Sequence, residues 1–137
     1  MFYRRPDRAH TVDSEFDVNG IDQLPRVDIA PAYAGADGLI IKALADAGVD
    51  GLVAAGLGSG SSPPPFMAAL KEVSDAGLPV VIATQTGSGR VMHTRRFTED
   101  GYIVADNLTP KKARILLMLA LTTTKDESEI QRMMLAY

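Results

Sequence analysis

The sequence predicts an α/β three-layer sandwich, in which a sheet of about four mainly parallel strands carries helices on both faces. Short apolar runs alternate with segments of helical periodicity along most of the chain. Such alternation is typical of parallel strands joined by right-handed crossovers. A length of 137 residues, 46% of them hydrophobic, suits one domain with one sizeable core.

Residues 1–24 are predicted to be an interdomain linker that leads into an α/β domain over residues 25–137. The linker mixes basic and acidic residues and shows little apolar periodicity. Its apolar pair, Phe16 and Val18, is placed to pack locally against an edge of the sheet. A domain that opens with a linker suggests that another domain precedes it.

The first strand and helix are marked by proline and glycine. Val27 and Ile29 alternate in a short strand that ends at Pro31, because proline cannot donate to a strand ladder. Asp37 is expected to cap a helix that Gly48 terminates. One apolar face of this helix comprises Leu39, Ile40, Ala43, Leu44 and Ala47.

Two further strands and the helix between them follow. Residues 51–55 are continuously small or apolar, as expected of a strand covered on both faces, and residues 80–83 form a third buried strand. Between them, Pro63 is predicted to be the first helical residue, with Ser62 as its cap. The buried stripe of that helix comprises Phe66, Met67, Leu70 and Val73, and Gly77 ends it.

The last third of the chain predicts one strand and two helices. Residues 102–105 are the predicted strand. A helix is predicted to begin at Thr109 and Pro110. Because residues 115–121 are apolar on every side of this helix, it should be the best-buried helix of the domain. Asp126 and Glu129 are spaced as a capping box for the final helix. Its apolar face comprises Ile130, Met133, Met134 and Tyr137. Together these elements make a small Rossmann-like sandwich.

Composition excludes several classes of function. A formal charge of −3, with basic and acidic residues intermixed, offers no broad cationic surface for nucleic acid. No run is long enough to cross a bilayer, and no leader segment is recognisable. With no cysteine and only two histidines, we expect neither a thiol nucleophile nor a histidine-rich metal site, and no cofactor. The compartment stays open, with the cytoplasm favoured, since any signal would lie upstream.

Ligands of such a sheet collect at the carboxyl ends of its strands, here the loops 31–36, 56–62 and 84–100. In the middle loop, alternate glycines free the backbone to approach a ligand, Ser59 and its neighbours offer hydroxyls, and the following helix start favours an anion such as a carboxylate. A dinucleotide fingerprint would need glycine at position 61, where Ser61 stands. The alternative is a tight strand-to-helix turn without a ligand.

The loop after the third strand is longer than a simple connection requires, and it carries Thr86, Ser88, Arg90, His93, Thr94, Arg95 and Arg96. A functional loop and a solvated surface loop are equally compatible with this composition. His93 is interpreted as a surface residue. No serine or threonine has a base and an orienting group arranged for nucleophilic catalysis, and residues 56–60 (GLGSG) do not match a nucleophile elbow.

Three stretches of the chain resemble one family when they are taken together. They are residues 16–18 leading to 24–27 (LPRV), residues 50–60 (DGLVAAGLGSG) and, most specific, residues 108–122 (LTPKKARILLMLALT). Their order and spacing are similar to those in the C-terminal domain of bacterial-type L-asparaginases, the asparaginase and glutaminase family. The resemblance covers nearly the whole chain from about Asp13.

The resemblance implies a two-domain subunit that hydrolyses the side-chain amide of asparagine, sometimes glutamine, through a threonine nucleophile and an acyl-enzyme. The family's catalytic threonines, in a T-G-G-T context and in a second motif, belong to its N-terminal domain and are not present here. The C-terminal domain helps to close a neighbouring subunit's active site, through an asparagine that falls on Ser61 and a glutamate that falls near Thr94. With Ser59 and Gly60, these residues are the expected site-completing group.

The leading hypothesis is therefore a domain that completes a substrate site and supports a dimer or tetramer, and that is inactive without its N-terminal catalytic domain. Its small-molecule partner would be an amide substrate. The rival hypothesis is a stand-alone Rossmann-like module that holds a small anion or nucleotide at residues 56–62. A third is a purely structural interaction domain.

Overall fold

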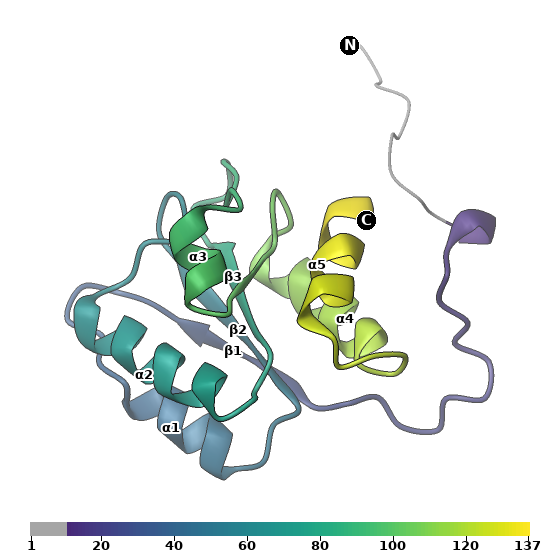
Figure 1. Cartoon of the computed structure of the whole chain (residues 1–137), viewed down its shortest axis with the longest axis horizontal. Coiled ribbons are helices and arrows are strands. Elements are labelled where there is room, and N and C mark those ends of the chain that lie inside the picture. Colours follow the sequence, from purple (N-terminus) through teal and green to yellow (C-terminus); the bar gives the residue numbers. More distant parts are fainter. Residues whose placement is uncertain (1–10) are drawn as a thin grey trace.

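Four parallel strands form a single sheet in the order β1-β2-β3-β4 in the computed structural model, which describes residues 11–137 (Figure 1). The predicted parallel α/β sandwich is confirmed. Residues 1–10 of the predicted linker lie outside the described residues. The strands are β1 (Val27–Pro31), β2 (Gly51–Gly56), β3 (Val80–Thr84) and β4 (Ile103–Val104).

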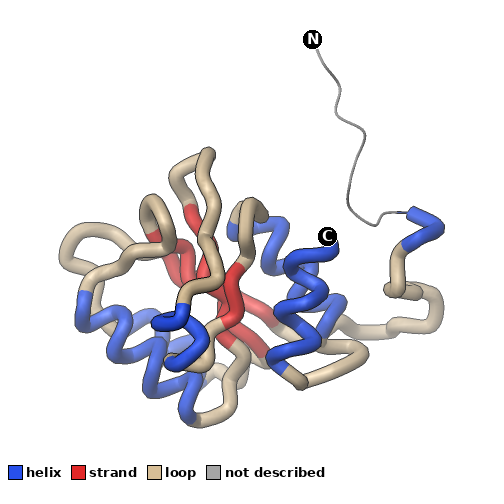
Figure 2. The backbone as a smooth tube through the Cα atoms, turned by 45° about the horizontal axis from the view of Figure 1, so that its top comes forward, coloured by secondary structure: helices blue, strands red, loops and turns tan. Residues whose placement is uncertain are grey.

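The register brings the strands' carboxyl ends to one edge of the sheet. Pro31 pairs with Ala55, and Gly56 pairs with Thr84. Every residue of β2 and β3 is buried, as expected of central strands covered on both faces. The loops that follow β1, β2 and β3 therefore emerge side by side, where ligands of parallel sheets bind (Figure 2).

Helices cover the two faces of the sheet unequally, and each face has its own apolar cluster (Figure 1). On one face, Phe66 and Ile41 pack against Leu52 and Ile82 in a cluster that also takes in Phe97. On the other, Leu117 and Met134 pack near Val53. The first face carries α1 (Leu39–Asp46), α2 (Pro64–Asp75) and α3 (Arg95–Glu99), and the second carries α4 (Pro110–Ala120) and α5 (Glu127–Ala136).

Two predicted helix starts are wrong by one position. Helix α2 begins at Pro64, not Pro63, and Ser62 is not its cap. Pro63 is held at ψ 148° because a residue that precedes proline is excluded from the helical region. Helix α1 has Gly38 at its N-cap position, and the Asp37 carboxylate instead accepts a hydrogen bond from the Leu39 amide at 3.0 Å.

Helix α4 is not the best-buried helix, contrary to the sequence-based prediction, because four of its eleven residues are buried against five of the twelve residues of α2. Thr109 caps it as predicted, and Leu116 and Leu117 are buried. However, Ile115 is 49% exposed, because only one side of α4 faces the sheet. A fully apolar run therefore leaves an apolar residue on the outer surface of the domain.

The capping box of α5 forms only in part. Asp126 accepts hydrogen bonds from the amides of Ser128 and Glu129, and bonds from Ser128 and these amides lower the pKa of its carboxyl. Glu129 does not reach back, since it pairs with Arg132, and the Asp126 amide donates to Thr124. The final helix is otherwise as predicted, with its core residues buried.

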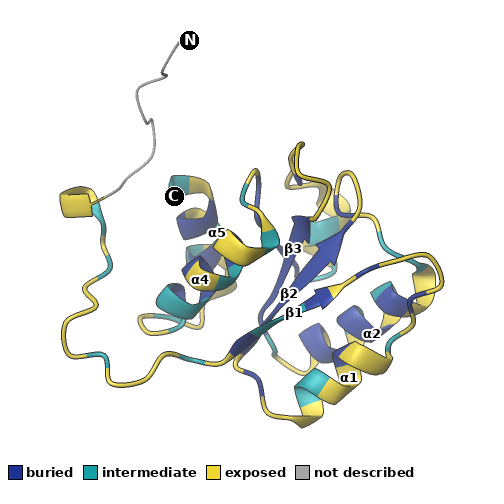
Figure 3. Cartoon of the chain, turned by 180° about the vertical axis from the view of Figure 1, so that it is seen from behind, coloured by how far each residue is buried: buried dark blue, intermediate teal, exposed yellow. Residues whose placement is uncertain are grey.

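Residues 11–26, which precede β1, are mainly exposed (Figure 3). Phe16 packs against the Tyr137 ring at the end of α5, with ring centroids 5.2 Å apart, rather than against a sheet edge. Val18 is exposed and not packed as predicted. The assignment of residues 1–24 as an interdomain linker stays a prediction. No helix within the described residues 11–137 is long and apolar enough to span a membrane.

Gln131 on α5 protects the outer edge of the sheet. Its Oε1 accepts from the Val104 amide at 2.8 Å, and its Nε2 donates to the Val104 carbonyl at 3.1 Å. A side-chain amide thus takes the place of a neighbouring strand beside edge strand β4.

Gln131→Ala should lower the free energy of unfolding by about 1–3 kcal/mol, because two part-buried backbone groups lose their partners. Urea denaturation of the chain measures this loss. Leu135→Ala, one turn further along α5 at a half-exposed position, is the control and should cost less. Equal losses in both variants would mean that the edge contact contributes little.

Candidate functional site

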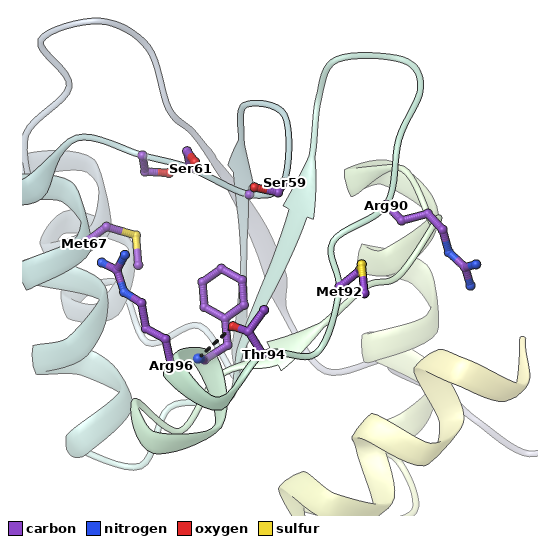
Figure 4. A pocket seen from close by; sticks show the side chains of 10 residues that line it. Ser59, Ser61, Met67, Arg90, Met92, Thr94 and Arg96 are labelled. Atoms are coloured by element: carbon purple, nitrogen blue, oxygen red, sulfur yellow. Dashed lines mark hydrogen bonds between the residues drawn. The ribbon is translucent and has the colours of Figure 1, made fainter.

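A cavity of about 350 Å³ opens between the β2–α2 turn and the segment that follows β3 (Figure 4). All four residues of the predicted site-completing group lie in its wall: Ser59, Gly60, Ser61 and Thr94. The remaining wall residues are Ser62, Met67, Arg90, Met92, Arg96 and Phe97. The structure therefore brings together residues that lie more than 30 positions apart in the chain.

The β2–α2 turn holds its serines through a tight backbone loop. The amide of Leu57 donates to the Ser61 carbonyl at 2.9 Å, and the amides of Gly60 and Ser61 donate to the Leu57 carbonyl at 3.0 and 2.8 Å. A Cβ atom on Gly56 would lie 2.6 Å from the Gly60 backbone. Glycine is therefore required at the base of the turn, and Ser59 within the turn lines the cavity.

The loop after β3 is fastened to the structure at several points, although it is largely exposed. The Val91 amide donates to the Asp106 carbonyl at 2.8 Å. The Arg90 guanidinium donates to the Asp106 carboxylate through Nε and Nη2, at 2.5 and 2.7 Å. At its start, Gln85 donates to the Ala32 carbonyl at 2.6 Å. These contacts hold the cavity wall formed by residues 90–94 in one position.

Asp106 is the buried half of the Arg90 ion pair, and its side chain is only 7% exposed. Its backbone is left-handed, with φ 53°, a conformation that aspartate tolerates better than most residues. The hydrogen bond and charge of Asp106 raise the pKa of Arg90. In Figure 4 the Arg90 side chain points away from the cavity, so its charge is directed to Asp106 and not to a ligand.

Thr94 has a structural contact as well as a place in the wall. It is the N-cap of α3, and its hydroxyl oxygen accepts from the Phe97 amide at 3.4 Å. The hydroxyl proton is not used in this contact and can donate elsewhere. Thr94 therefore both starts α3 and offers one donor beside the cavity.

His93 lies outside this site. It is exposed, its Nε2 is 3.3 Å from the Thr98 hydroxyl, and it lines a separate hollow of about 340 Å³ near α5. In the described part of the chain no group of three or more His, Cys, Asp or Glu side chains is arranged to bind a metal ion.

Tyr102, whose hydroxyl donates to the Met67 carbonyl at 3.4 Å, has a pKa raised to about 12, mainly by burial.

Sequence reasoning missed three members of the wall: Met67, Met92 and Phe97. Met67 was interpreted as part of a buried stripe, but it is only partly buried and faces the cavity. Helical spacing correctly placed Met67 on the side of α2 that faces the sheet. No sequence signal, however, distinguishes a side chain packed fully against the sheet from one that lines a cavity at its edge. Arg96 was noted only as one of several polar residues of the loop.

Comparisons with known proteins identify the family. The pattern of the family described as Glutaminase/Asparaginase C-terminal domain matches residues 26–134. The chain is 40% identical over 139 residues to a glutaminase-asparaginase of Pseudomonas fluorescens biotype A, covering 99% of this chain and 38% of that protein. It is 38% identical over 138 residues to L-asparaginase 2 of Escherichia coli K12, covering 99% of this chain and 40% of that protein.

A solved structure agrees with this similarity. The probable cytoplasmic L-asparaginase of Campylobacter jejuni superimposes with a TM-score of 0.94 at 40% sequence identity, over 100% of this chain and 44% of that one. The chain thus spans about two fifths of the length of these relatives, and the matching model is that of a C-terminal domain. We conclude that the chain belongs to the glutaminase/asparaginase C-terminal domain family.

Proposed function

We propose that this chain completes the substrate site of an L-asparaginase-type amidohydrolase, which hydrolyses L-asparagine to L-aspartate and ammonia. In this proposal the nucleophilic threonines lie in an N-terminal domain. The observation that carries it is the gathering of Ser59, Gly60, Ser61 and Thr94 around one open cavity at the carboxyl edge of a parallel sheet. Relatives named L-asparaginase or glutaminase-asparaginase are more than twice the length of the matched region.

The chemistry of the cavity supports a role in binding rather than in bond cleavage. A serine nucleophile needs a base within hydrogen-bond reach and a group that orients the base. No histidine or carboxylate of residues 11–137 hydrogen-bonds to the hydroxyls of Ser59, Ser61 or Ser62. These side chains are suited to donate hydrogen bonds to a substrate that is attacked by a group from elsewhere.

The cavity also has the form expected of half a site. Its wall residues Ser59, Ser61 and Thr94 are exposed, so a substrate bound there would be covered only on one side. A second domain could supply the missing wall.

We further propose that the chain supports a homo-oligomer, for which the half-exposed Ile115 on the outer face of α4 offers an apolar contact.

Ammonia release from L-asparagine tests the proposal directly. The chain alone should show no release, whereas the chain mixed with a separately expressed N-terminal domain of the same enzyme should show it, because nucleophile and site-completing wall are then both present. L-glutamine, assayed in parallel, reports the substrate preference. Clear activity of the chain alone, or activity of the N-terminal domain that the chain does not increase, would contradict the proposal.

Ser61→Ala in the mixture tests the wall itself. Loss of one neutral hydrogen bond to the substrate is expected to reduce kcat/KM about threefold to tenfold. Ser128→Ala on α5, remote from the cavity, is the control for mutation in general.

The alternative of a stand-alone small-molecule module is not favoured, since the relatives carry this region as the C-terminal part of a longer enzyme.

A further inference from the structure

The chain contains two asparagines, Asn19 and Asn107, and both are exposed. They differ in the residue that follows. Asn19 precedes Gly20, whose backbone nitrogen has no side chain beside it, whereas Asn107 precedes the branched Leu108. The side-chain amide of an asparagine can react with the backbone nitrogen of the next residue, and a side chain on that residue hinders the attack. The two positions therefore differ in their steric access for this reaction.

The backbone N–H groups that follow the two asparagines also differ. Within residues 11–137, the N–H of Gly20 donates to no other group. The N–H of Leu108 donates to the Ala105 carbonyl at 2.9 Å, and the Leu108 side chain packs against the apolar cluster under α4 and α5. A nitrogen whose N–H is hydrogen-bonded must lose that bond before it can attack. The Gly20 nitrogen is therefore the more reactive of the two.

The turn around Asn19 and Gly20 is held loosely. It is closed by a hydrogen bond from the Ile21 amide to the Val18 carbonyl, whose length of 3.4 Å exceeds the usual range for such bonds. Gly20 has φ 83°, and a Cβ atom there would meet nothing within 4 Å. The backbone can therefore rotate toward the asparagine side chain without disturbing the packed part of the domain.

We propose that Asn19 is a site of spontaneous deamidation, in which water is the co-reactant. The Gly20 nitrogen loses its proton to solvent hydroxide and bonds to Asn19 Cγ. The bond from Cγ to Nδ2 then breaks, and Nδ2 takes a proton from water and leaves as ammonia. Water next opens the cyclic imide at either of its two carbonyls, which gives aspartate or isoaspartate at position 19. This inference does not depend on the proposed function.

Asp17 holds the side-chain amide that reacts. Its Oδ1 accepts from Asn19 Nδ2 at 2.8 Å and from the Asn19 backbone amide at 2.9 Å. Deamidation replaces the Nδ2 donor by a carboxylate, which Asp17 repels, so the turn should open. Glu15 and Phe16, which contact α5, come just before this turn. The modification therefore alters the stretch between those contacts and β1.

Incubation of the purified chain without L-asparagine tests the proposal. Ammonia should accumulate to one equivalent per chain and then stop, and it should form faster at mildly alkaline than at neutral pH, because the attacking nitrogen must lose a proton. Peptide mapping by mass spectrometry should locate the change at residue 19, converted at least about tenfold faster than Asn107. The amide signals of the ¹⁵N-labelled chain should shift mainly at residues 15–22.

Variants of the turn test the mechanism. Gly20→Ala should slow the conversion severalfold, because its methyl group hinders the nitrogen, and Asn19→Gln should prevent it on the same time scale, because a larger ring would have to close. Asp17→Ala should speed it about twofold to tenfold, since the amide is released from its hydrogen bonds. Asp22→Ala, which removes a charge in the same exposed segment, is the matched control and should react at the unaltered rate.

An unchanged mass at residue 19, equal conversion of Asn19 and Asn107, or an unaltered rate in Gly20→Ala would overturn the proposal. Its failure is distinguishable from failure of the proposed function. Ammonia from Asn19 needs no L-asparagine and stops at one equivalent, whereas hydrolysis of L-asparagine by the two-domain mixture continues with added substrate. Asn19→Gln should remove the first signal and leave the second unchanged.

Discussion

Gly60→Ala is expected to lower the free energy of unfolding by roughly 2–5 kcal/mol and to disorder the β2–α2 turn. Two effects add. Gly60 has φ 93°, where a side chain causes strain of about 1–2 kcal/mol. In addition, a Cβ atom there would lie 2.6 Å from Ile82 Cγ2 and 3.2 Å from Val91 Cγ1, and overpacking of this kind costs about 1–3 kcal/mol.

Gly58→Ala separates these two effects. Gly58 lies in the same turn with φ 56°, but a Cβ atom there would meet nothing within 4 Å. The free energy of unfolding of this variant should therefore fall by only about 1–2 kcal/mol, from backbone strain alone. Chemical denaturation of both variants gives the comparison. Equal losses would show that contact with Ile82 and Val91 is relieved by movement of the turn, and that the turn is not held as rigidly as its hydrogen bonds indicate.

Phe66→Ala should destabilise the chain by about 3–5 kcal/mol, since it removes a fully buried aromatic ring and leaves a cavity in the core. Phe66 lies in the first turns of α2 and is 0% exposed in the cluster between α2 and the sheet. Because Met67 follows directly and lines the cavity beside the β2–α2 turn, loss of this anchor should also loosen that wall.

Phe66→Leu is the control, since it keeps most of the buried volume and is expected to cost about 1–2 kcal/mol. Urea unfolding curves provide the free energies of unfolding of both variants. If Phe66→Ala lowered the free energy of unfolding no more than Phe66→Leu does, the residues around α2 would be able to fill the space left by the ring. That outcome would contradict the close packing of Phe66 in this cluster.

Most of the fold is predictable from local rules. Buried strands were recognised as apolar runs in residues 51–55 and 80–83, and the Thr109 cap was recognised from its position before Pro110. These signals are local because backbone hydrogen bonding and side-chain periodicity act over a few residues. Where prolines are adjacent, as at positions 63–65, the exclusion of the helical region before proline moved the boundary by one residue.

The candidate site was predictable only in outline. The carboxyl-edge rule selected the loops after the strands, and the family resemblance selected Ser61 and Thr94 within them. Which neighbours share their cavity depends on how α2 and α3 lie against the sheet. Met67 and Arg96 face the opening, whereas Arg95, next in sequence to Arg96, pairs with Glu99 on the exposed side.

The sequence by itself determined the order of the elements, the parallel sheet and the family, because each depends on patterns that lie along the chain. Only the tertiary structure decided where the charges point. Arg90 and Arg96 are both loop arginines in the sequence, but Arg90 pairs with Asp106, 16 positions away, while Arg96 lines the cavity. The direction of a long side chain depends on partners that folding brings close, and no local pattern encodes it.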